Sequence, residues 1–493
     1  MSLTQKIVEK KKQRLFWLVL ALFLMVPGAW GHVGSKDVFE TVDAGPYKLF
    51  VTVRPPTVIP GVAEVEVRVS GAAATAVRIT PIPLTGEASK HPPSADVMTV
   101  SKDDASFYTG GVWLMASGSW QVRFEVDGAA GRQVASVPVP AVAISTLKME
   151  RGMGLGLAAL GVFLFCSMAG LVAAGVREAR LAPAVVADSA RRRRGLVAMG
   201  IAVAVMGLMV WGGAKWWDVE AADYAGHVWK PLKSSAQLNG NVLDLMVKAI
   251  VPSTTDRENK GRSNNDFLPD HGKLIHLYAI REPEMDVALH LHPELVATGD
   301  FRMTLPPMPA GRYTLFGDVV HASGFPETLV TTLDVPAGTG AGALGVDDAS
   351  ATPAALSAGV LGTTYKLPDG YSMVWDAPSQ LTATTAYTFR FRLLGPDGQA
   401  ASGMEPYLGM AGHAAFVKTD GTVFAHTHPN GSAAMPAMDL ANSGMMMAMD
   451  MPISVGPEVG FPYGFPSAGR YRIFVQMKHS GVVETGVFDA VVK

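Results

Sequence analysis

Two tetrapeptides of one kind, His290-Leu291-His292-Pro293 and His426-Thr427-His428-Pro429, decide how the C-terminal half of the chain is organised. Each is preceded, at nearly the same spacing, by a further histidine, His276 in the first case and His413 in the second. The intervening residues are apolar on either side of a turn, as expected for a β-hairpin. A pattern that recurs within one chain indicates a duplicated structural unit.

The similarity continues beyond these two hairpins. The tetrapeptide Ala-Gly-Arg-Tyr follows in both halves, and nine residues after its arginine comes another histidine, His321 or His479. Eight of the 12 histidines occupy such paired positions, which argues against chance placement. We therefore predict two β-domains of one design, residues 215–336 and 365–493. Between them, residues 337–364 are rich in Gly, Ala, Ser and Pro and are interpreted as a linker.

The second hairpin allows its register to be predicted. Asp420-Gly421 is a strong two-residue turn signal. Counting back from this turn places His413 opposite His428, and directly opposed side chains lie about 4.5–5.5 Å apart at Cβ. His426 and His428 are two residues apart and therefore point to one face of the sheet. Three imidazoles should thus converge on one face of each hairpin, with the histidine of the later strand as a fourth nitrogen.

Clusters of three or four histidines without cysteine suit copper or zinc among the biological metals, in an oxidising setting outside the cytoplasm. His271 also lies near the first cluster in the sequence. It is given less weight because the corresponding position of the second domain is a leucine, Leu408. The alternative is that all these histidines are hydrogen-bonded fixtures of a duplicated fold. The candidate metal ligands are His276, His290, His292 and His321 in the first domain, and His413, His426, His428 and His479 in the second.

A methionine-rich segment, Met435–Met451, interrupts the second domain. Soft thioethers select Cu(I), so Met445, Met447 and Met449 are predicted to be additional copper ligands. The alternative is a flexible apolar flap, since methionine is an adaptable filler of irregular gaps.

Three apolar segments concern the membrane. Leu15–Trp30, after a basic start, is interpreted as a signal peptide within residues 1–31 or as an uncleaved N-terminal anchor. Met153–Val176 and Gly195–Gly213 are each long enough to cross a bilayer core, which needs about 20 helical residues. The basic loop Arg177–Arg194 between them marks the cytoplasmic side. Residues 151–214 are therefore predicted to form a transmembrane hairpin in a bacterial inner membrane, with the bulk of the chain in the periplasm.

Residues 32–150 are predicted to form a further β-sandwich. Tyr47–Val53, Ala63–Val69 and Trp120–Val126 alternate apolar and polar residues, which is typical of half-buried strands. The predicted fold class is therefore mainly β, with three Ig-like β-sandwich domains outside the membrane and a two-helix transmembrane hairpin. If His32 is the mature N-terminus, its amine and imidazole could chelate one copper ion.

Several functional classes are disfavoured by the sequence. A formal net charge of −2 and a charged fraction of 17% give no basic surface for nucleic acid. The chain contains no nucleophile elbow, no Walker-type loop and no HExxH motif, so an enzyme is less favoured than a binding protein. A copper oxidase or monooxygenase stays open as an alternative, because three histidines around an open position form a catalytic geometry.

Two resemblances extend this interpretation. With His32 at a mature N-terminus, an Ig-like strand pattern and an attached membrane hairpin, the N-terminal part resembles periplasmic copper-handling β-sandwiches of the CopC and YtkA-like class. The C-terminal domains resemble uncharacterised secreted bacterial domains. The residues that carry this resemblance are Tyr407-Leu408-Gly409, Gly412-His413, the His-x-His-Pro motif and Ala468-Gly469-Arg470-Tyr471. These resemblances imply a role in copper handling.

The sequence therefore predicts a membrane-anchored periplasmic protein that binds copper, with zinc as the alternative, for handling or delivery. Its expected partners are the inner membrane, a metal ion and another membrane protein. The competing hypothesis is a structural or interaction subunit of an envelope or membrane complex, whose histidines bind no metal.

Overall fold

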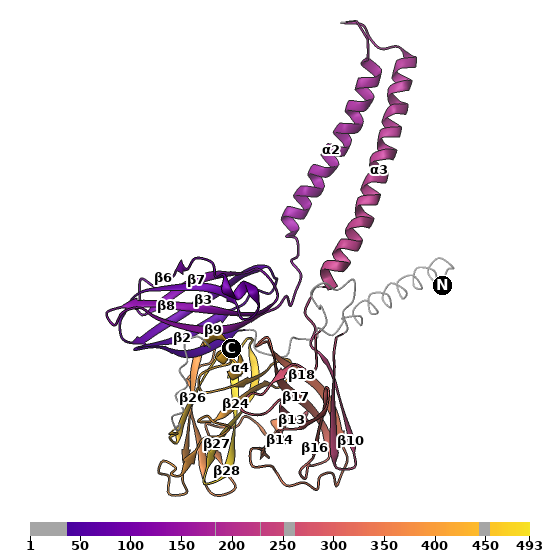
Figure 1. Cartoon of the computed structure of the whole chain (residues 1–493). Coiled ribbons are helices and arrows are strands. Elements are labelled where there is room, and N and C mark those ends of the chain that lie inside the picture. The colour runs from indigo at the N-terminus through magenta and orange to yellow at the C-terminus, as the bar shows by residue number, and fades with distance from the viewer. Residues whose placement is uncertain (1–36, 183, 227, 251–261, 443–453) are drawn as a thin grey trace, which may run out of the picture.

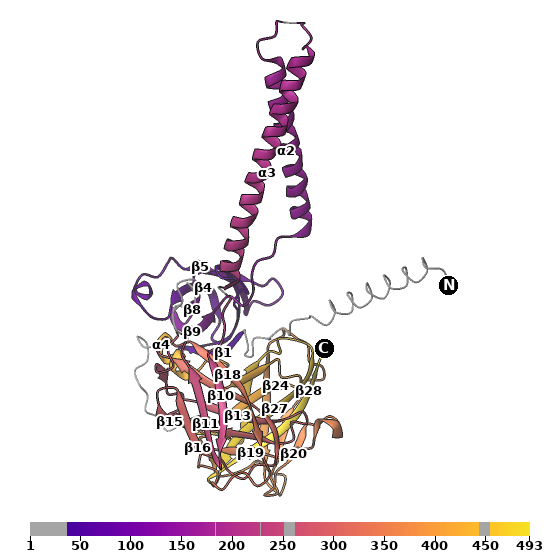
Figure 2. The same ribbon diagram turned by 90° about the vertical axis from the view of Figure 1, so that its right-hand side faces the viewer.

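The structure is a computed structural model that describes residues 37–493 except residues 183, 227, 251–261 and 443–453. The chain is mainly β, with several antiparallel sheets, and two long apolar helices project from the β-assembly as a hairpin. Figures 1 and 2 show the N-terminal sandwich between this hairpin and the two C-terminal domains.

The N-terminal sandwich consists of two antiparallel sheets around an aliphatic core, in which Val51, Val67 and Phe124 are fully buried. The three alternating segments expected to be strands are β2, β3 and β8, so this prediction is confirmed. The first sheet has the order β1 (Val38–Ala44), β2 (Tyr47–Arg54), β3 (Gly61–Gly71), β7 (Phe107–Leu114) and β6 (Thr99–Val100). The second has the order β5 (Asp96–Val97), β4 (Ala74–Pro83), β8 (Gly118–Gly128) and β9 (Gln133–Ala141), and the short helix η1 (Glu87–Lys90) follows β4.

Helices α2 (Arg151–Glu178) and α3 (Ser189–Gly226) each contain an 18-residue stretch with a mean hydropathy of 2.3 and 2.1, respectively, and are long and apolar enough to cross a membrane. Their large apolar side chains are exposed, as at Leu155 and Leu208. Extended exposed apolar surface of this kind marks a contact with lipid or with another protein. The helices approach closely at Gly195, where an added Cβ would lie 2.9 Å from the carbonyl oxygen of Ala173. Helix α3 continues beyond the predicted span, which was expected to end at Gly213.

The first C-terminal domain, called repeat 1, contains two antiparallel sheets. One has the order β10 (Lys233–Asn239), β11 (Val242–Lys248), β16 (Asp300–Thr304) and β15 (Glu294–Ala297). The other has the order β12 (Phe267–Leu268), β17 (Gly311–His321), β13 (His276–Glu282), β14 (Ala288–Leu291) and β19 (Ala349–Ala351), and β18 (Pro326–Val335) also pairs with β17.

The second C-terminal domain, called repeat 2, has the same plan. One sheet has the order β20 (Thr364–Lys366), β21 (Ser372–Asp376), β22 (Tyr387–Leu394) and β26 (Glu458–Tyr463). The other has the order β23 (Met404–Glu405), β27 (Gly469–His479), β24 (His413–Lys418) and β25 (Phe424–Thr427), and β28 (Val482–Val492) also pairs with β27. Helix α4 (Met435–Asn442) follows β25.

The hairpin registers are those predicted. Leu277 pairs with Leu291, so His276 lies across from His292 at the end of β13–β14. Ala414 pairs with Thr427, which places His413 across from His428 in the same way.

The segment expected to be a linker, residues 337–364, differs from that expectation. It contains β19, which pairs with β14 and extends the sheet of repeat 1, and the short helix η2 (Leu356–Ala358). Ala349 and Ala351 of β19 are buried. Alanine is common in flexible segments, but its small side chain also fits a strand enclosed by a neighbouring domain, so composition alone did not separate the two cases.

The two repeats pack face to face through the sheets that carry the histidines. In β13, Leu277 and Ala279 point into the core of repeat 1, whereas Tyr278 and Ile280 belong to a second core shared with repeat 2. Phe316 and Phe424 stack across this boundary with ring centroids 4.5 Å apart. Strands β13 and β24 are therefore buried on both faces.

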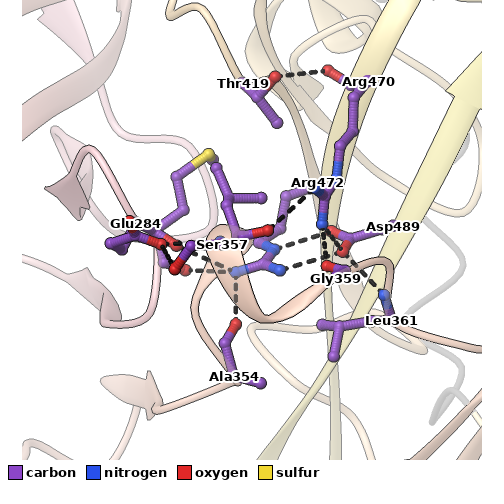
Figure 3. Close-up of polar contacts among 11 residues, drawn as sticks. Glu284, Ala354, Ser357, Gly359, Leu361, Thr419, Arg470, Arg472 and Asp489 are labelled. Atoms are coloured by element: carbon purple, nitrogen blue, oxygen red, sulfur yellow. Dashed lines mark hydrogen bonds and ion pairs between the residues drawn. The ribbon is translucent and has the colours of Figure 1, made fainter.

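A buried ion pair within repeat 2 also receives hydrogen-bond acceptors from outside that repeat (Figure 3). Arg472 of β27 is fully buried and donates to both carboxylate oxygens of Asp489, at 2.8 and 3.0 Å. Its remaining nitrogen donates to the carbonyl oxygens of Met285 and Ala354 of repeat 1, both at 2.9 Å. Since a buried guanidinium requires a full set of acceptors, repeat 1 completes the environment of a repeat 2 side chain.

The N-terminal sandwich is fastened to repeat 2 through β1. Phe39 is buried in the core of repeat 2, with its ring centroid 6.0 Å from that of Tyr463. The backbone of Phe39 exchanges hydrogen bonds with Ser432, and Thr41 N donates to the carbonyl oxygen of Asn430. The loop that follows the second His-x-His-Pro motif is thus held by β1, the first strand of the described residues.

Candidate metal centre

The histidines of the two hairpins meet in one place because the sheets that carry them pack face to face. The ring centroid of His276 lies 6.0 Å from that of His413 and 5.2 Å from that of His426. His271 joins them from the loop before β13, with its ring centroid 5.0 Å from that of His428. The group is called the histidine cluster and comprises His271, His276, His290 and His292 of repeat 1 and His413, His426 and His428 of repeat 2.

Three of these rings form a close group, called centre A, made of His276, His290 and His292. His276 Nδ1 lies 3.2 Å from His290 Nε2 and 3.3 Å from His292 Nε2. Two nitrogens bound to one tetrahedral ion at about 2.0–2.1 Å lie about 3.3–3.4 Å apart. The spacing of centre A therefore matches imidazoles that share one metal ion.

The outward nitrogens of centre A show where its protons are. His276 Nε2 lies 3.1 Å from the carbonyl oxygen of Asp270, and His292 Nδ1 lies 2.9 Å from a carboxylate oxygen of Asp348. His290 Nδ1 lies 2.8 Å from Gln476 Oε1. A neutral imidazole has one N–H, and an outer hydrogen bond of this kind fixes its tautomer. Each ring donates outwards, so three unshared electron pairs face one another inside the protein.

A second group, centre B, consists of His271, His413 and His428, which come from both repeats. The Nε2 atoms of all three are buried and, within the residues that the structure describes, make no hydrogen bond. His428 Nδ1 lies 3.4 Å from the carbonyl oxygen of Ala433, which accepts a hydrogen bond from its N–H group. His271 Nε2 lies 3.3 Å from a carboxylate oxygen of Asp270. Buried polar atoms are nearly always paired, so the unpaired Nε2 atoms of His413 and His428 require an explanation.

His426 connects the two centres. Its Nε2 lies 3.0 Å from His413 Nδ1, and its Nδ1 lies 3.5 Å from a carboxylate oxygen of Asp318. With its own proton towards Asp318, His426 accepts from His413 and leaves His413 Nε2 free towards centre B. His276, His413 and His426 also lie close enough to act as one ligand group.

Burial keeps these imidazoles neutral. Desolvation, together with the neighbouring histidines, lowers the pKa of His276, His290, His413 and His428 well below the usual value, and it lowers the pKa of His271 to about 4. A metal ion binds the neutral ring, so little proton release opposes binding at neutral pH. The buried histidine groups could therefore hold a metal ion without a change of protonation.

A partly open cavity of about 130 Å³ reaches the histidine cluster from the side of the N-terminal sandwich. His276, His426 and His428 line it, together with Trp120 of the N-terminal sandwich and Ala437 of α4. A metal site needs such an entry path.

His321 and His479 do not supply the expected fourth nitrogen. Strand β13 begins with His276 opposite Asp318, and β24 begins with His413 opposite Gln476. The later histidines therefore lie beyond the ends of these strands, next to β12 and β23. His321 has both ring nitrogens within 3.0 Å of carboxylates, those of Asp266 and Glu327.

Other predicted ligands lie outside the described residues. These are His32 and the methionines Met445, Met447 and Met449, whose roles stay predictions. Helix α4 covers Met435–Asn442, the first part of the methionine-rich segment, and its Ala437 lines the cavity that reaches the cluster.

Sequence reasoning gave too little weight to His271 and did not find the outer partners Gln476, Asp318 and Asp348. His271 and Leu408 occupy equivalent left-handed turn positions, with φ of 51° and 50°. Asn, Asp and His tolerate this conformation better than bulky apolar residues do. His271 and Leu408 were therefore matched correctly. A ligand that occurs in one repeat alone cannot be recognised by comparing the two repeats.

Comparisons with known proteins add little about function. Residues 364–493, which include all of repeat 2, match a family described as "Domain of unknown function (DUF8832)". No curated protein matches the chain. These comparisons give no support to the resemblance to the CopC and YtkA-like class, so a role in copper handling depends on the residues alone.

Three solved structures are similar over most of this chain but at very low scores. A tetra-tandem repeat from the extending region of a large adhesion protein has 8% identity, a TM-score of 0.15 and coverage of 89% of this chain and 72% of its own. A 1.5-MDa bacterial ice-binding adhesin has 8% identity, a TM-score of 0.14 and coverages of 92% and 99%. Escherichia coli alpha-2-macroglobulin has 10% identity, a TM-score of 0.18 and coverages of 90% and 30%. Similarities at this level carry no argument about function.

Proposed function

We propose that this chain is a membrane-tethered metal-binding protein whose histidine cluster holds copper, with zinc as the alternative, for storage or delivery outside the cytoplasm. The single observation that carries the proposal is centre A. Three inward nitrogens of His276, His290 and His292 face one another, while their protons are held outwards by Asp270, Gln476 and Asp348. Unshared electron pairs that face one another repel, and a cation between them turns that repulsion into ligation.

An all-imidazole set favours copper over most divalent ions. Affinity of nitrogen sites rises along the first-row metals to Cu²⁺ and falls again at Zn²⁺. The proposed thioether ligands Met445, Met447 and Met449 follow α4 in the sequence and would suit Cu(I). We propose that they pass copper to the cluster or receive it from the cluster.

The proposed location is the periplasmic face of a bacterial inner membrane. The hairpin of α2 and α3 has Arg177 near the end of the first helix and Arg191–Arg194 near the start of the second. Positive charge beside apolar helices marks the cytoplasmic side, so the β-assembly would lie on the opposite side. Another membrane protein that donates or receives the ion is the proposed partner.

The proposal is tested on the full-length protein in detergent, after removal of metal by chelation and dialysis. Titration with Cu²⁺, with Cu⁺ under reducing conditions and with Zn²⁺ should give tight binding, and X-ray absorption should show nitrogen ligands for Cu²⁺ and Zn²⁺. The variant His290→Asn should lose an ion, whereas His91→Asn should retain all of them because His91 is exposed in the N-terminal sandwich.

The competing function is a structural or interaction subunit, supported by the hydrogen bonds that the same histidines make within repeat 2, between His413 and His426, and between the repeats, from His290 to Gln476. On this alternative, the purified protein binds neither copper nor zinc. The His290→Asn change would then lower the unfolding temperature with no effect on metal content. That result would overturn the metal-binding proposal.

A further inference from the structure

A second group of potential ligands lies in repeat 2, away from the histidine cluster. Its members are Asp369, His479 and Glu484, which offer one ligand atom each within 4.8 Å of one another. His479 Nε2 lies 3.4 Å from a carboxylate oxygen of Asp369 and 3.6 Å from one of Glu484. Asp369 belongs to the loop between β20 and β21, whereas the other two residues lie on the β27–β28 hairpin.

His479 is buried without satisfying its ring. It is 4% exposed, and neither of its nitrogens makes a hydrogen bond with any residue that the structure describes. Leaving a buried polar atom unpaired costs about 1–3 kcal/mol. The ring of Tyr371 covers one side of it, with centroids 4.2 Å apart. An imidazole held this way beside two carboxylates has the arrangement of a ligand rather than of a structural hydrogen-bonding group.

Repeat 1 contains the matching position and shows what can neutralise it. His321 corresponds to His479, and Glu327 corresponds to Glu484. In each repeat, the glutamate pairs across the strands with the residue that stands two positions before the histidine. In repeat 1, Arg262 Nη1 lies 3.1 Å from Glu327 Oε2, and the same glutamate oxygen lies 3.0 Å from His321 Nε2. A guanidinium thus supplies the positive charge beside the acidic group.

In repeat 2, no arginine or lysine of the described residues forms an ion pair with Asp369 or Glu484. Two carboxylates and an imidazole therefore meet without the cation that their counterparts in repeat 1 have. The charge of a divalent ion would balance both carboxylates.

We propose that Asp369, His479 and Glu484 form a divalent-cation site, separate from the histidine cluster, for an ion such as Mn²⁺ or Zn²⁺. Carboxylate oxygens suit Mn²⁺, and zinc sites accept mixed imidazole and carboxylate ligands. The side chain of Asp369 is 37% exposed, so the site is open to solvent on one side and leaves room for water ligands. This inference is independent of the proposed copper site.

The site also has a structural consequence. An ion there would join the loop between β20 and β21 of one sheet to the β27–β28 hairpin of the other sheet. It would thus fasten the two sheets of repeat 2 at the end where His479 lies.

The test uses Mn²⁺ alone, because Mn²⁺ is a weak competitor for all-imidazole ligands. The metal-free, full-length protein in detergent is titrated with Mn²⁺, and the free ion is followed by its six-line electron paramagnetic resonance signal. One Mn²⁺ should bind per chain. The affinity should fall by about 100-fold or more in Glu484→Gln and in Asp369→Asn, since removing even an outer-shell partner of a metal typically costs about 10–100-fold.

Matched controls separate this site from the others. Glu327→Gln, at the equivalent position of repeat 1, and the double variant His276→Asn/His413→Asn should leave Mn²⁺ binding unchanged. Asp369 lies in a partly exposed loop, so its variant provides the measurement should Glu484→Gln fail to fold. The proposal is overturned if the wild-type protein binds no Mn²⁺, or if folded Asp369→Asn binds it as tightly as wild type.

Discussion

His276 and His413 are the first residues of β13 and β24, and they face each other across the junction of the two repeats with ring centroids 6.0 Å apart. They hold equivalent positions in a duplicated unit. Each belongs to two ligand groups, which are centre A for His276, centre B for His413, and for both of them the group that they form with His426. The duplication therefore did not produce two separate sites. It produced one buried cluster to which both copies contribute.

The first prediction concerns the number of ions. Centre A and centre B have no histidine in common, so two copper ions per chain are expected at saturation. His292→Asn should remove the ion of centre A and leave one, and His428→Asn should do the same for centre B. Metal content after gel filtration, measured by mass spectrometry, checks both numbers. Retention of two ions by either variant would contradict the assignment.

The stability of the metal-free protein should depend on pH through the same histidines. Burial lowers the pKa of His276, His290, His413 and His428, so below about pH 6.5 the unfolded chain binds more protons than the folded one. The free energy of unfolding should be highest above that pH and should fall as pH decreases. The slope is up to about 1.4 kcal/mol per pH unit for each histidine. Urea unfolding at several pH values measures it.

Glu40 should give the opposite dependence. It is fully buried between the N-terminal sandwich and repeat 2, where burial raises its pKa to about 8 although Ala433 N donates to it. The folded chain then binds more protons than the unfolded chain between about pH 4.5 and 8. Stability from this group is therefore present below that range and is lost as pH rises through it.

Glu40→Gln tests that dependence, because glutamine keeps the acceptor for Ala433 and cannot ionise. The variant should be more stable than wild type at pH 8, and the difference should shrink towards pH 5. Differential scanning calorimetry at the two pH values shows whether it does. If the variant and the wild type differ in stability by the same amount at both pH values, Glu40 is already ionised in the folded protein.

The buried pair of Arg472 and Asp489 should be costly to break. Asp489→Ala leaves a buried guanidinium with backbone carbonyl acceptors alone, and loss of one partner of a buried pair costs about 3–5 kcal/mol. Glu458→Ala, which removes the exposed partner of Arg390, should cost at most about 1 kcal/mol. Chemical denaturation of both variants gives the comparison. Similar losses would show that the buried pair contributes no more to stability than the exposed one.

Much of the hairpin geometry could be predicted from sequence. The Asp420-Gly421 turn and the spacing of His413 and His428 determined the register, because side chains alternate with a strict period of two along a strand. The same rule placed His276 across from His292. These predictions needed local geometry alone, and the structure confirms both registers.

The contact between the repeats could not be derived in that way. Periodicity tells which side chains share a face, but not which surface covers that face. A partial signal was present in Leu277-Tyr278-Ala279-Ile280, since a continuous apolar run is typical of a strand buried on both sides. His479 was expected next to His413 for a related reason. Its distance from His413 depends on where β24 begins relative to β27, and the number of residues between Arg470 and His479 does not reveal this.

The position of Phe39 has a consequence for how the chain is made. This residue belongs to the first described strand, yet it fills the core of repeat 2, which is synthesised after the membrane hairpin and repeat 1. Repeat 2 therefore cannot complete its interior from its own residues and has to recruit a side chain produced several hundred residues earlier. We therefore expect the interior of repeat 2 to become complete only after it docks on the N-terminal sandwich, which is made earlier in the chain.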